Sequence, residues 1–294
     1  MTEYKLFPGC FIQNRIPFIE ASAKFVFEQL GVQQSAGKFG CCPNPVGLRF
    51  VDEKTWAVLG ARNLAEAEAE GKPIMSLCNG CYQSLAVVDH ELKHNANLKS
   101  EVNNILAEVG KEYKGTIRVE HFVRVLHDEV GLEAIKSKIT KPLTGLKVAL
   151  HPGCHYARPS HILKGEDPFD LHYLRDLVEV TGATVVDYPQ EELCCGNGVR
   201  NSDPYTANTM LKAKIDGALA AGADCFTVNC PACFQQMDAE QRNLKELAEE
   251  GQEYKFPTFY ITELLAMAMG KTPKDIGVNF HRNKGKNALG KVGL

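Results

Sequence analysis

Short apolar runs alternate with longer amphipathic segments along the chain. The runs that have the length and residue types of buried strands are 4–7, 73–77, 148–150, 183–187 and 225–228. Apolar residues at helical spacing predict helices at 16–30, 49–70, 171–180 and 204–221, and one that begins at Pro231. Strands that alternate with helices are typical of parallel sheets covered by helices. We therefore expect an α/β fold with binding loops at the carboxyl ends of the strands.

The length of the chain indicates two domains. Its 294 residues are about twice the length of an average domain. A polar stretch near residue 140 precedes the strand at 148–150, so we place an N-terminal domain at 1–143 and a second domain at 144–270. Residues 271–294 are rich in Gly, Lys and Asn, and we expect them to form a basic, extended tail or a partner-binding arm.

Composition and charge exclude several classes of protein. Hydrophobic residues make up 44% and charged residues 23%, as in ordinary soluble proteins. No apolar run approaches the roughly 18 residues that a membrane helix needs, and no basic leader precedes an apolar segment at the N-terminus. The net charge of -3 gives no bias toward nucleic acid. We expect a cytoplasmic protein without a membrane span or a nucleic-acid partner.

The eleven cysteines are the unusual part of the composition. Their odd number, the expected reducing compartment and the size of the chain all argue against disulfides. Reduced thiolates are ligands for soft metals, so metal or redox chemistry is the leading interpretation. Cys225 is the exception, because it lies inside a predicted apolar strand and is interpreted as a buried core thiol.

Ten cysteines form one pattern that occurs twice: a single cysteine after Pro-Gly, an adjacent pair, and Cys-x-x-Cys. The first copy is Cys10, Cys41, Cys42, Cys78 and Cys81, and the second is Cys154, Cys194, Cys195, Cys230 and Cys233. Because the groups follow predicted strands, they should gather at the carboxyl ends of the sheets. The repeat predicts two tandem, duplicated α/β domains with mainly parallel sheets, each with its own metal site.

Each copy supplies five thiolates, whereas a structural zinc or a cubic [4Fe-4S] cluster takes four. Adjacent cysteines can face one metal assembly only at a turn, which Gly196 and Gly198 favour after the second pair. One sulfur of such a pair can then bridge two irons. Five thiolates around four irons suggest an opened, non-cubic cluster with room for an outside sulfur ligand.

The duplicated pattern resembles the cysteine-rich CCG domain. Two such domains without added ferredoxin cysteines resemble the family of B subunits of methanogen heterodisulfide reductases. The resemblance implies that each group of five cysteines holds a noncubane [4Fe-4S] cluster. It implies that the disulfide of coenzyme M and coenzyme B lies between the two clusters and is reduced to two thiols. No catalytic residue beyond the cluster ligands is expected.

The resemblance also implies partners within a heterodisulfide reductase complex. The ferredoxin-like C subunit would deliver electrons, and the flavin-containing A subunit would bifurcate them, fed by a hydrogenase or formate dehydrogenase module. The chain itself has no Gly-x-Gly-x-x-Gly after a predicted strand, so electrons must come from outside.

Polar residues near the second cysteine group are candidates for binding the substrate. His155 and Arg158 have the chemistry to donate a proton or to hold a sulfonate or phosphate, although ordinary loop polarity is an equal alternative. Arg200 is a weaker candidate of the same kind. His281, in the basic tail, is interpreted as a surface residue.

Two other functions remain open at this stage. CCG domains also resemble parts of redox systems that act on fumarate, quinones or hydroxy acids. A different class of function is a zinc or iron-sulfur scaffold that organises a complex without catalysis. Metal content and the choice of electron acceptor distinguish these alternatives.

Overall fold

The strands form two four-stranded sheets in the computed structural model, which describes residues 2–43, 47–249 and 252–294. The strands are β1 (Tyr4–Phe7), β2 (Gln34–Ala36), β3 (Ile74–Ser76), β4 (Val119–His121), β5 (Lys147–His151), β6 (Thr184–Val185), β7 (Cys225–Val228) and β8 (Thr258–Tyr260). The first sheet has the order β2-β1-β3-β4 and the second β6-β5-β7-β8, and every strand pair is parallel. The predicted α/β class and its duplication are therefore confirmed.

Helices cover both sheets. The α-helices are α1 (Gly9–Arg15), α2 (Phe18–Gln29), α3 (Leu48–Val51), α4 (Glu53–Glu68), α5 (Asn79–His94), α6 (Ala96–Ala107), α7 (Phe122–Arg124), α8 (Leu132–Lys136), α9 (Tyr173–Glu179), α10 (Pro204–Ala220), α11 (Pro231–Ala239), α12 (Ile261–Ala268) and α13 (Lys286–Gly290). One π-helix, η1 (Val125–Val130), and the 3₁₀ helices η2 (Asn197–Val199), η3 (Glu240–Glu246) and η4 (Val278–Phe280) complete them.

The same local chemistry starts the equivalent helices α4 and α10. Asp52 caps α4 by accepting a hydrogen bond of 2.9 Å from the backbone N–H of Thr55, and Asp203 caps α10 through a bond of 3.0 Å from Thr206. An aspartate at this position satisfies one of the free N–H groups of the first turn. The two helices thus begin at matching positions of the repeat.

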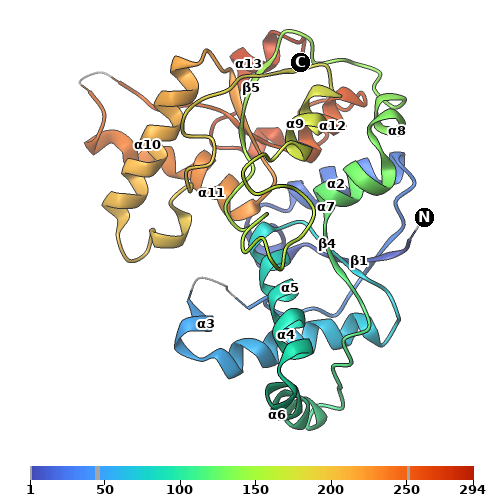
Figure 1. The fold of residues 1–294 in the computed structure, drawn as a ribbon. Helices are drawn as coiled ribbons and strands as arrows, with labels where there is room; N and C mark the ends of the chain where they lie inside the picture. Colours follow the sequence, from blue (N-terminus) through green and yellow to red (C-terminus); the bar gives the residue numbers. More distant parts are fainter. Residues whose placement is uncertain (1, 44–46, 250–251) are drawn as a thin grey trace.

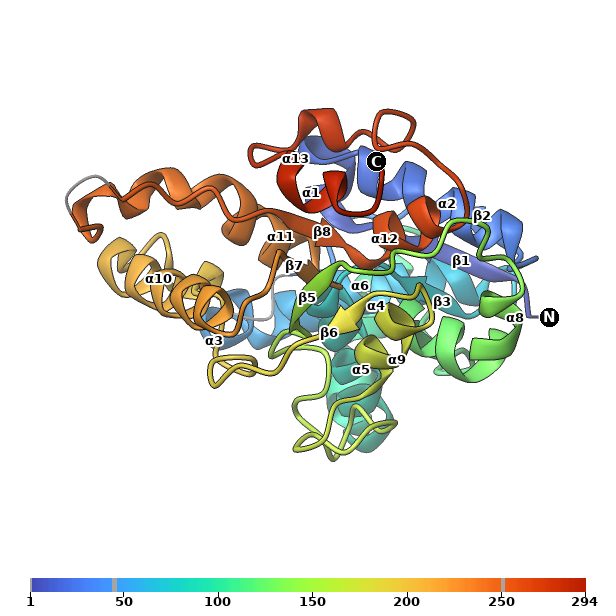
Figure 2. The same ribbon diagram turned by 90° about the horizontal axis from the view of Figure 1, so that it is seen from above.

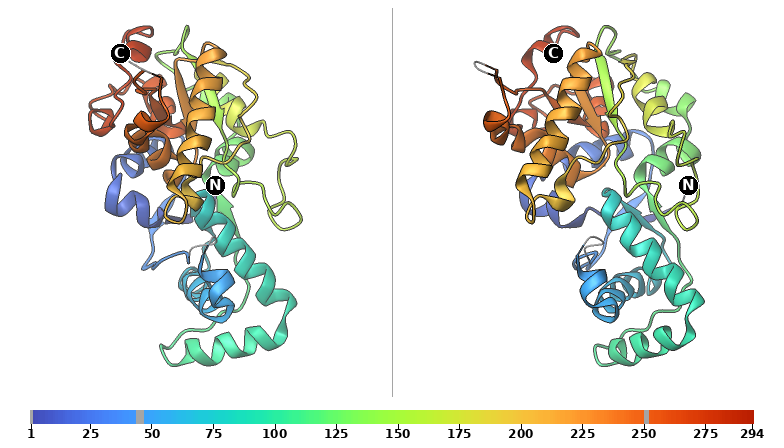
Figure 3. Two further views of the ribbon diagram at one scale, coloured as in Figure 1. Left: turned by 90° about the vertical axis from the view of Figure 1, so that its left-hand side faces the viewer. Right: turned by 60° about the vertical axis from the view of Figure 1, so that its left-hand side comes forward.

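The two halves pack closely against each other (Figure 1). Helix α2 of the first half lies against α12 of the second, and the hydroxyls of Ser22 and Thr262 are 2.8 Å apart between them. Helix α12 is buried along its whole length. By contrast, α6 lies at the far end of the first half from the second sheet (Figure 3). Because α2 and α12 pack together, the hydrophobic core is continuous across both halves.

The C-terminal segment packs on the molecule instead of extending from it. Figure 2 shows it, in red, beside α1 and α2. The Phe280 ring stacks on Phe18 of α2, and Val278 and Leu289 are buried. The expectation of an extended tail at 271–294 is wrong, because apolar side chains of this segment are buried and the Phe280 ring packs on Phe18 of the first half. The domain boundaries themselves stay a prediction.

The helices of the described residues do not meet the requirements of a membrane span. None of the helices there combines the length and the apolar character that a bilayer span requires.

Candidate metal centre

Each cysteine group lies just beyond the carboxyl end of a strand. Cys10 and Cys154 follow β1 and β5, and the two adjacent pairs come in the loops after β2 and β6. Cys78 and Cys230 occupy the N-cap positions of α5 and α11, at the ends of β3 and β7. Because parallel strands end at one edge of a sheet, this topology gathers five thiols of each half in one place.

The glycines before the two single cysteines allow the chain to pass close to the other thiols. Gly9 has φ +78°, and a Cβ there would lie 2.9 Å from Sγ of Cys81. Gly153 has φ +80°, and a Cβ there would lie 2.5 Å from the Asn79 amide nitrogen. Any other residue would be strained at these φ values and would also displace a neighbour. The Pro-Gly-Cys motif therefore has a structural cause in both copies.

Thiols of the first group bond directly to one another. Cys42 accepts hydrogen bonds from Cys41 and Cys81, and these bonds lower the pKa of Cys42 to about 4. A third hydrogen bond connects Cys81 to Cys78. Cys10 is exposed as a residue, but its sulfur is partly buried. This partial burial, together with the nearby charge of Cys42, raises the pKa of the Cys10 thiol. The first group therefore brings several cysteine sulfurs together, with Cys42 as their common acceptor.

The second group has the same arrangement. Cys194 accepts hydrogen bonds from Cys154 and Cys195, which lower the pKa of Cys194 to about 2. The backbone N–H of Gly196 also points to the Cys194 sulfur, at 3.4 Å. The Sγ atoms of Cys195 and Cys233 are 3.5 Å apart. The adjacent pair therefore faces one common space, as the turn at Gly196 predicted.

The two groups meet at Cys78 and Cys230. The thiols of Cys233 and Cys78 both donate to the Cys230 sulfur, and together they hold the pKa of Cys230 well below its usual range. We call the resulting connected series the thiol chain, and its order is Cys41, Cys42, Cys81, Cys78, Cys230, Cys233, Cys195, Cys194 and Cys154. Sequence reasoning assigned these residues to two sites but did not predict the direct contact between them.

Polar side chains fix this junction from both halves. The single O–H of Tyr260 is shared between the backbone carbonyl of Leu77 and, at 2.9 Å, that of Asn229. These carbonyls belong to the residues before Cys78 and Cys230. The hydroxyl thus ties together the ends of strands β3 and β7, one from each sheet.

The donor set fits iron held by sulfur. Ten thiols in two compact groups are soft ligands, as iron-sulfur clusters require. A ring nitrogen of the buried His151 and the Sγ atoms of Cys195 and Cys233 all lie within 4.8 Å of one another, and neither His151 ring nitrogen has a hydrogen-bond partner in the described part of the chain. An unsatisfied buried polar group of this kind indicates a bound group that would accept its hydrogen bond.

A pocket of about 430 Å³ opens beside the second group. Residues from both halves line it: Arg49, Phe50, Trp56, Gln83, Ser84, Val87, His155, Cys194, Gly198, Val199 and Met210. His155 is placed with Nδ1 3.2 Å from Sγ of Cys154. The Arg49 guanidinium lies 4.9 Å from the centre of the Trp56 ring and 3.2 Å from Glu91. Sequence reasoning missed Arg49 and Trp56, since only the fold of distant segments brings them to Cys194.

The other candidate side chains lie differently. Arg158 pairs with Glu192 at 2.7 Å and is not among the residues of this pocket, so its role toward a substrate stays a prediction. Arg200 donates to Gln236 at 3.1 Å. Cys225 is buried within β7, as expected. The interpretation of His281 as a surface residue is wrong: it is buried, and its Nε2 lies 2.8 Å from the Glu263 carboxylate.

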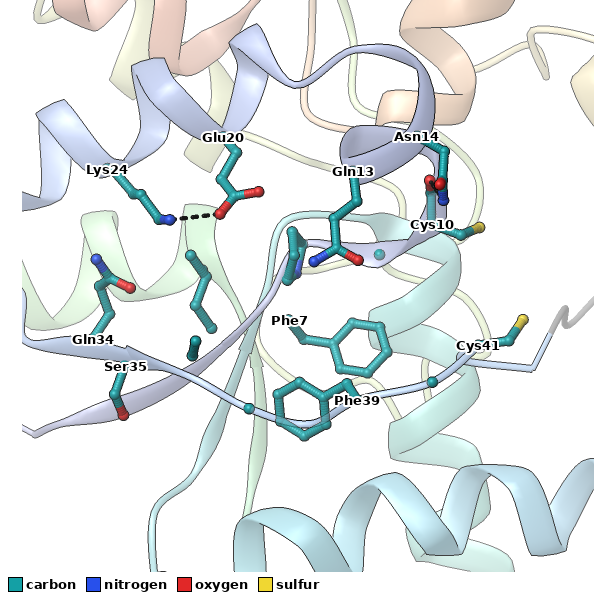
Figure 4. A pocket seen from close by; sticks show the side chains of 16 residues that line it. Phe7, Cys10, Gln13, Asn14, Glu20, Lys24, Gln34, Ser35, Phe39 and Cys41 are labelled. Atoms are coloured by element: carbon teal, nitrogen blue, oxygen red, sulfur yellow. Dashed lines mark hydrogen bonds and ion pairs between the residues drawn. The ribbon is translucent and has the colours of Figure 1, made fainter.

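A second pocket, of about 580 Å³, opens beside the first group (Figure 4). Cys10 and Cys41 lie at its edge with their sulfurs on the same side. Behind them the rings of Phe7 and Phe39 pack together at 4.8 Å between centroids. The two sites therefore differ in their surroundings although their thiols match.

Comparisons with known proteins agree with this geometry. A family model described as a cysteine-rich domain, CCG, matches residues 4–86 and 148–238. The chain is 38% identical to the B subunit of the ferredoxin/F(420)H(2)-dependent CoB-CoM heterodisulfide reductase of Methanosarcina acetivorans, over 99% of this chain and 97% of that one. It is 30% identical to the membrane anchor subunit of the 8-methylmenaquinol:fumarate reductase of Wolinella succinogenes, over 94% of this chain and 95% of that one.

A solved structure has the same fold. The crystal structure of a hypothetical protein from Helicobacter pylori superposes with a TM-score of 0.74 at 15% identity. The superposition covers 96% of this chain and 52% of the other. At this identity the likeness concerns the fold alone.

Proposed function

The chain belongs to the family of heterodisulfide reductase B subunits, which are CCG-domain proteins, and on that premise we propose that it is the catalytic component that reduces the coenzyme M–coenzyme B disulfide. The more general role, which the relatives support, is that of an iron-sulfur redox protein. The single observation that favours the specific role is the junction of the two metal groups, where the Tyr260 hydroxyl joins the carbonyls of the residues before Cys78 and Cys230.

The proposal assigns each group of five thiols to one noncubane [4Fe-4S] cluster. Such clusters supply single electrons and iron that coordinates thiolate sulfur. The balanced reaction adds two electrons and two protons to the S–S bond, which breaks to give two thiols. Cys10, Cys41, Cys42, Cys78 and Cys81 would hold one cluster, and Cys154, Cys194, Cys195, Cys230 and Cys233 the other.

In this proposal the other residues of the 430 Å³ pocket bind and orient the disulfide substrate. Arg49 would hold an anionic group of the substrate, because a guanidinium matches sulfonate and phosphate oxygens. Trp56 supplies an apolar wall that excludes water. His155, whose ring nitrogen is 3.2 Å from the Cys154 sulfur, is placed to hold a proton next to a developing thiolate. Arg158 would contribute from farther along the same loop.

The proposed setting is a cytoplasmic complex. Electrons would arrive from the ferredoxin-like C subunit of heterodisulfide reductase, which is supplied by the flavin-containing A subunit and a hydrogenase or formate dehydrogenase module. This setting is supported by the names of the relatives, which are B subunits of heterodisulfide reductases.

A second candidate is electron transfer to a quinone or fumarate system. It is favoured by the 30% identity with the Wolinella succinogenes protein. The test is to purify the protein without oxygen, to count iron and zinc, and to assay candidate acceptors with a reduced viologen. The proposal predicts about eight irons per chain and turnover of the coenzyme M–coenzyme B disulfide. Two zincs with almost no iron would exclude catalysis, and turnover of a quinone alone would favour the second candidate.

A further inference from the structure

The two metal groups have equivalent thiols but different residues behind them. Strands β1 and β5 occupy the same position in their respective sheets. Each ends three residues before the single cysteine of its half. The last residue is Phe7 in the first half and His151 in the second. The repeat thus places a hydrocarbon ring at one site and an imidazole at the other.

His151 is buried beside the second metal group. It is 1% exposed, and among the described residues neither of its ring nitrogens is hydrogen-bonded. An imidazole ring carries at least one N–H, which in this buried position needs an acceptor nearby. One His151 ring nitrogen and the Sγ atoms of Cys195 and Cys233 lie within 4.8 Å of one another, so the sulfurs of the second group are within reach of a ring N–H.

A second pair of equivalent residues differs in charge. Asn63 stands eleven residues after the cap Asp52 in α4, and Lys214 stands eleven residues after the cap Asp203 in α10. Both reach the loop that carries the adjacent cysteines. The Asn63 side chain donates to the Cys41 carbonyl at 2.8 Å and accepts from the Gly40 N–H at 2.8 Å.

Lys214 replaces this neutral amide with a buried ammonium group. The side chain is fully buried, and Nζ donates to the backbone carbonyls of Gln190, Glu191 (3.0 Å) and Leu193 (2.8 Å). All three N–H bonds of the ammonium are used, which fixes the charge directly behind Cys194. Burial lowers the lysine pKa to about 8, while the nearby thiolates of Cys195 and Cys233 act to raise it.

We propose that His151 and Lys214 are positioning residues that raise the reduction potential of the cluster held by the second group and so make the two clusters electronically unequal. The inference rests on the proposed clusters. Reduction adds one negative charge to a cluster, and both a hydrogen bond to its sulfurs and a nearby fixed cation stabilise that charge. Phe7 and Asn63 supply neither at the first site.

Exchange of the differing residues tests this without altering any of the ten cysteines. The variants are His151→Phe, the reciprocal Phe7→His, and Lys214→Met. Lys212→Met is the matched control, because Lys212 is on the same helix but pairs at 2.6 Å with the partly exposed Asp216. The measurement is an anaerobic reductive titration of the iron-loaded protein, followed by absorption and electron paramagnetic resonance.

Two transitions are expected in the unmodified protein. His151→Phe and Lys214→Met should shift the same transition to lower potential and leave the other in place. Phe7→His should raise the other one, and Lys212→Met should move neither. If Lys214→Met fails to retain iron, the potentials measured in His151→Phe and Phe7→His decide whether the inference holds. Unchanged potentials in iron-loaded His151→Phe and Phe7→His would overturn this inference alone, whereas an unmodified protein that binds no iron would also overturn the proposed function.

Discussion

The amide nitrogen of Asn79 lies 2.7 Å from the backbone carbonyl of Pro152. Asn79 follows directly after Cys78, and Pro152 stands two residues before Cys154, so this one bond joins the metal-binding loops of the two halves. The same nitrogen is 3.3 Å from the side-chain oxygen of Asn229. The loops of the two sites are therefore held in one fixed arrangement.

Asn79→Ala should loosen this arrangement. The variant leaves the Pro152 carbonyl without its buried donor, which costs roughly 1–3 kcal/mol of unfolding free energy. Chemical denaturation of the iron-loaded protein measures the loss. Asn208→Ala is a suitable control, because that residue makes only a 3.4 Å bond from a partly exposed position on α10. Equal stability of the two variants would show that the junction does not depend on Asn79.

Gly9→Ala should impair metal binding at the first site. At φ +78° a side chain costs about 1–2 kcal/mol, and the added Cβ would also lie 2.9 Å from the Cys81 sulfur. We expect about half of the iron to be lost, since only one of two sites is disturbed. Gly71→Ala is the control, because Gly71 has φ +65° but no atom within 4 Å of the added Cβ. Full iron content in Gly9→Ala would contradict the expectation.

The buried pair of His281 and Glu263 should make stability depend on pH. Burial acts to lower the pKa of His281, but the Glu263 carboxylate outweighs it, and the net shift is upward. A raised pKa in the folded state means that the contribution is complete below the unfolded value of about 6.5 and is lost as the pH rises through the folded value. Unfolding free energies measured from pH 6 upward should therefore fall in this window.

His281→Gln should flatten that part of the pH profile. His94→Gln, on the exposed end of α5, serves as the control and should retain the slope of the unmodified protein. A slope that survives in His281→Gln would assign the pH dependence to another group.

Arg49→Gln tests the proposed binding of an anionic substrate. Loss of the guanidinium should raise KM about tenfold, equivalent to about 1.4 kcal/mol, with little change in kcat. Steady-state assays with a viologen donor separate the two constants. The control is Arg62→Gln, on α4 outside this pocket. A fall in kcat at constant KM would show that Arg49 acts in some other way.

Local signals in the sequence predicted much of the fold. Strand β7 and helix α10 agree with their predicted ranges to within a residue, because an apolar run specifies one and an Asp-Pro start specifies the other. Strands β2, β4 and β8 were missed. All three are edge strands of only three residues, which is too short for an alternating pattern or an apolar run to mark them.

Site residues divide in a similar way. The cysteines could be assigned to two groups from spacing alone, since order and local motif repeat. The Cys78–Cys230 contact and the position of Arg49 beside Cys194 arise from packing between halves, which no local pattern encodes. The burial of His281 was mispredicted for the same reason: its partner Glu263 belongs to α12, outside the polar segment that surrounds it in sequence.

The contact between Cys78 and Cys230 also sets an order of events during synthesis. Cys78 leaves the ribosome long before Cys230, and until α12 is made the face of α2 that packs on it has no cover. The first metal group therefore reaches its final surroundings only when most of the chain has been translated. The fold therefore couples the completion of the first metal group to the folding of the second half of the chain.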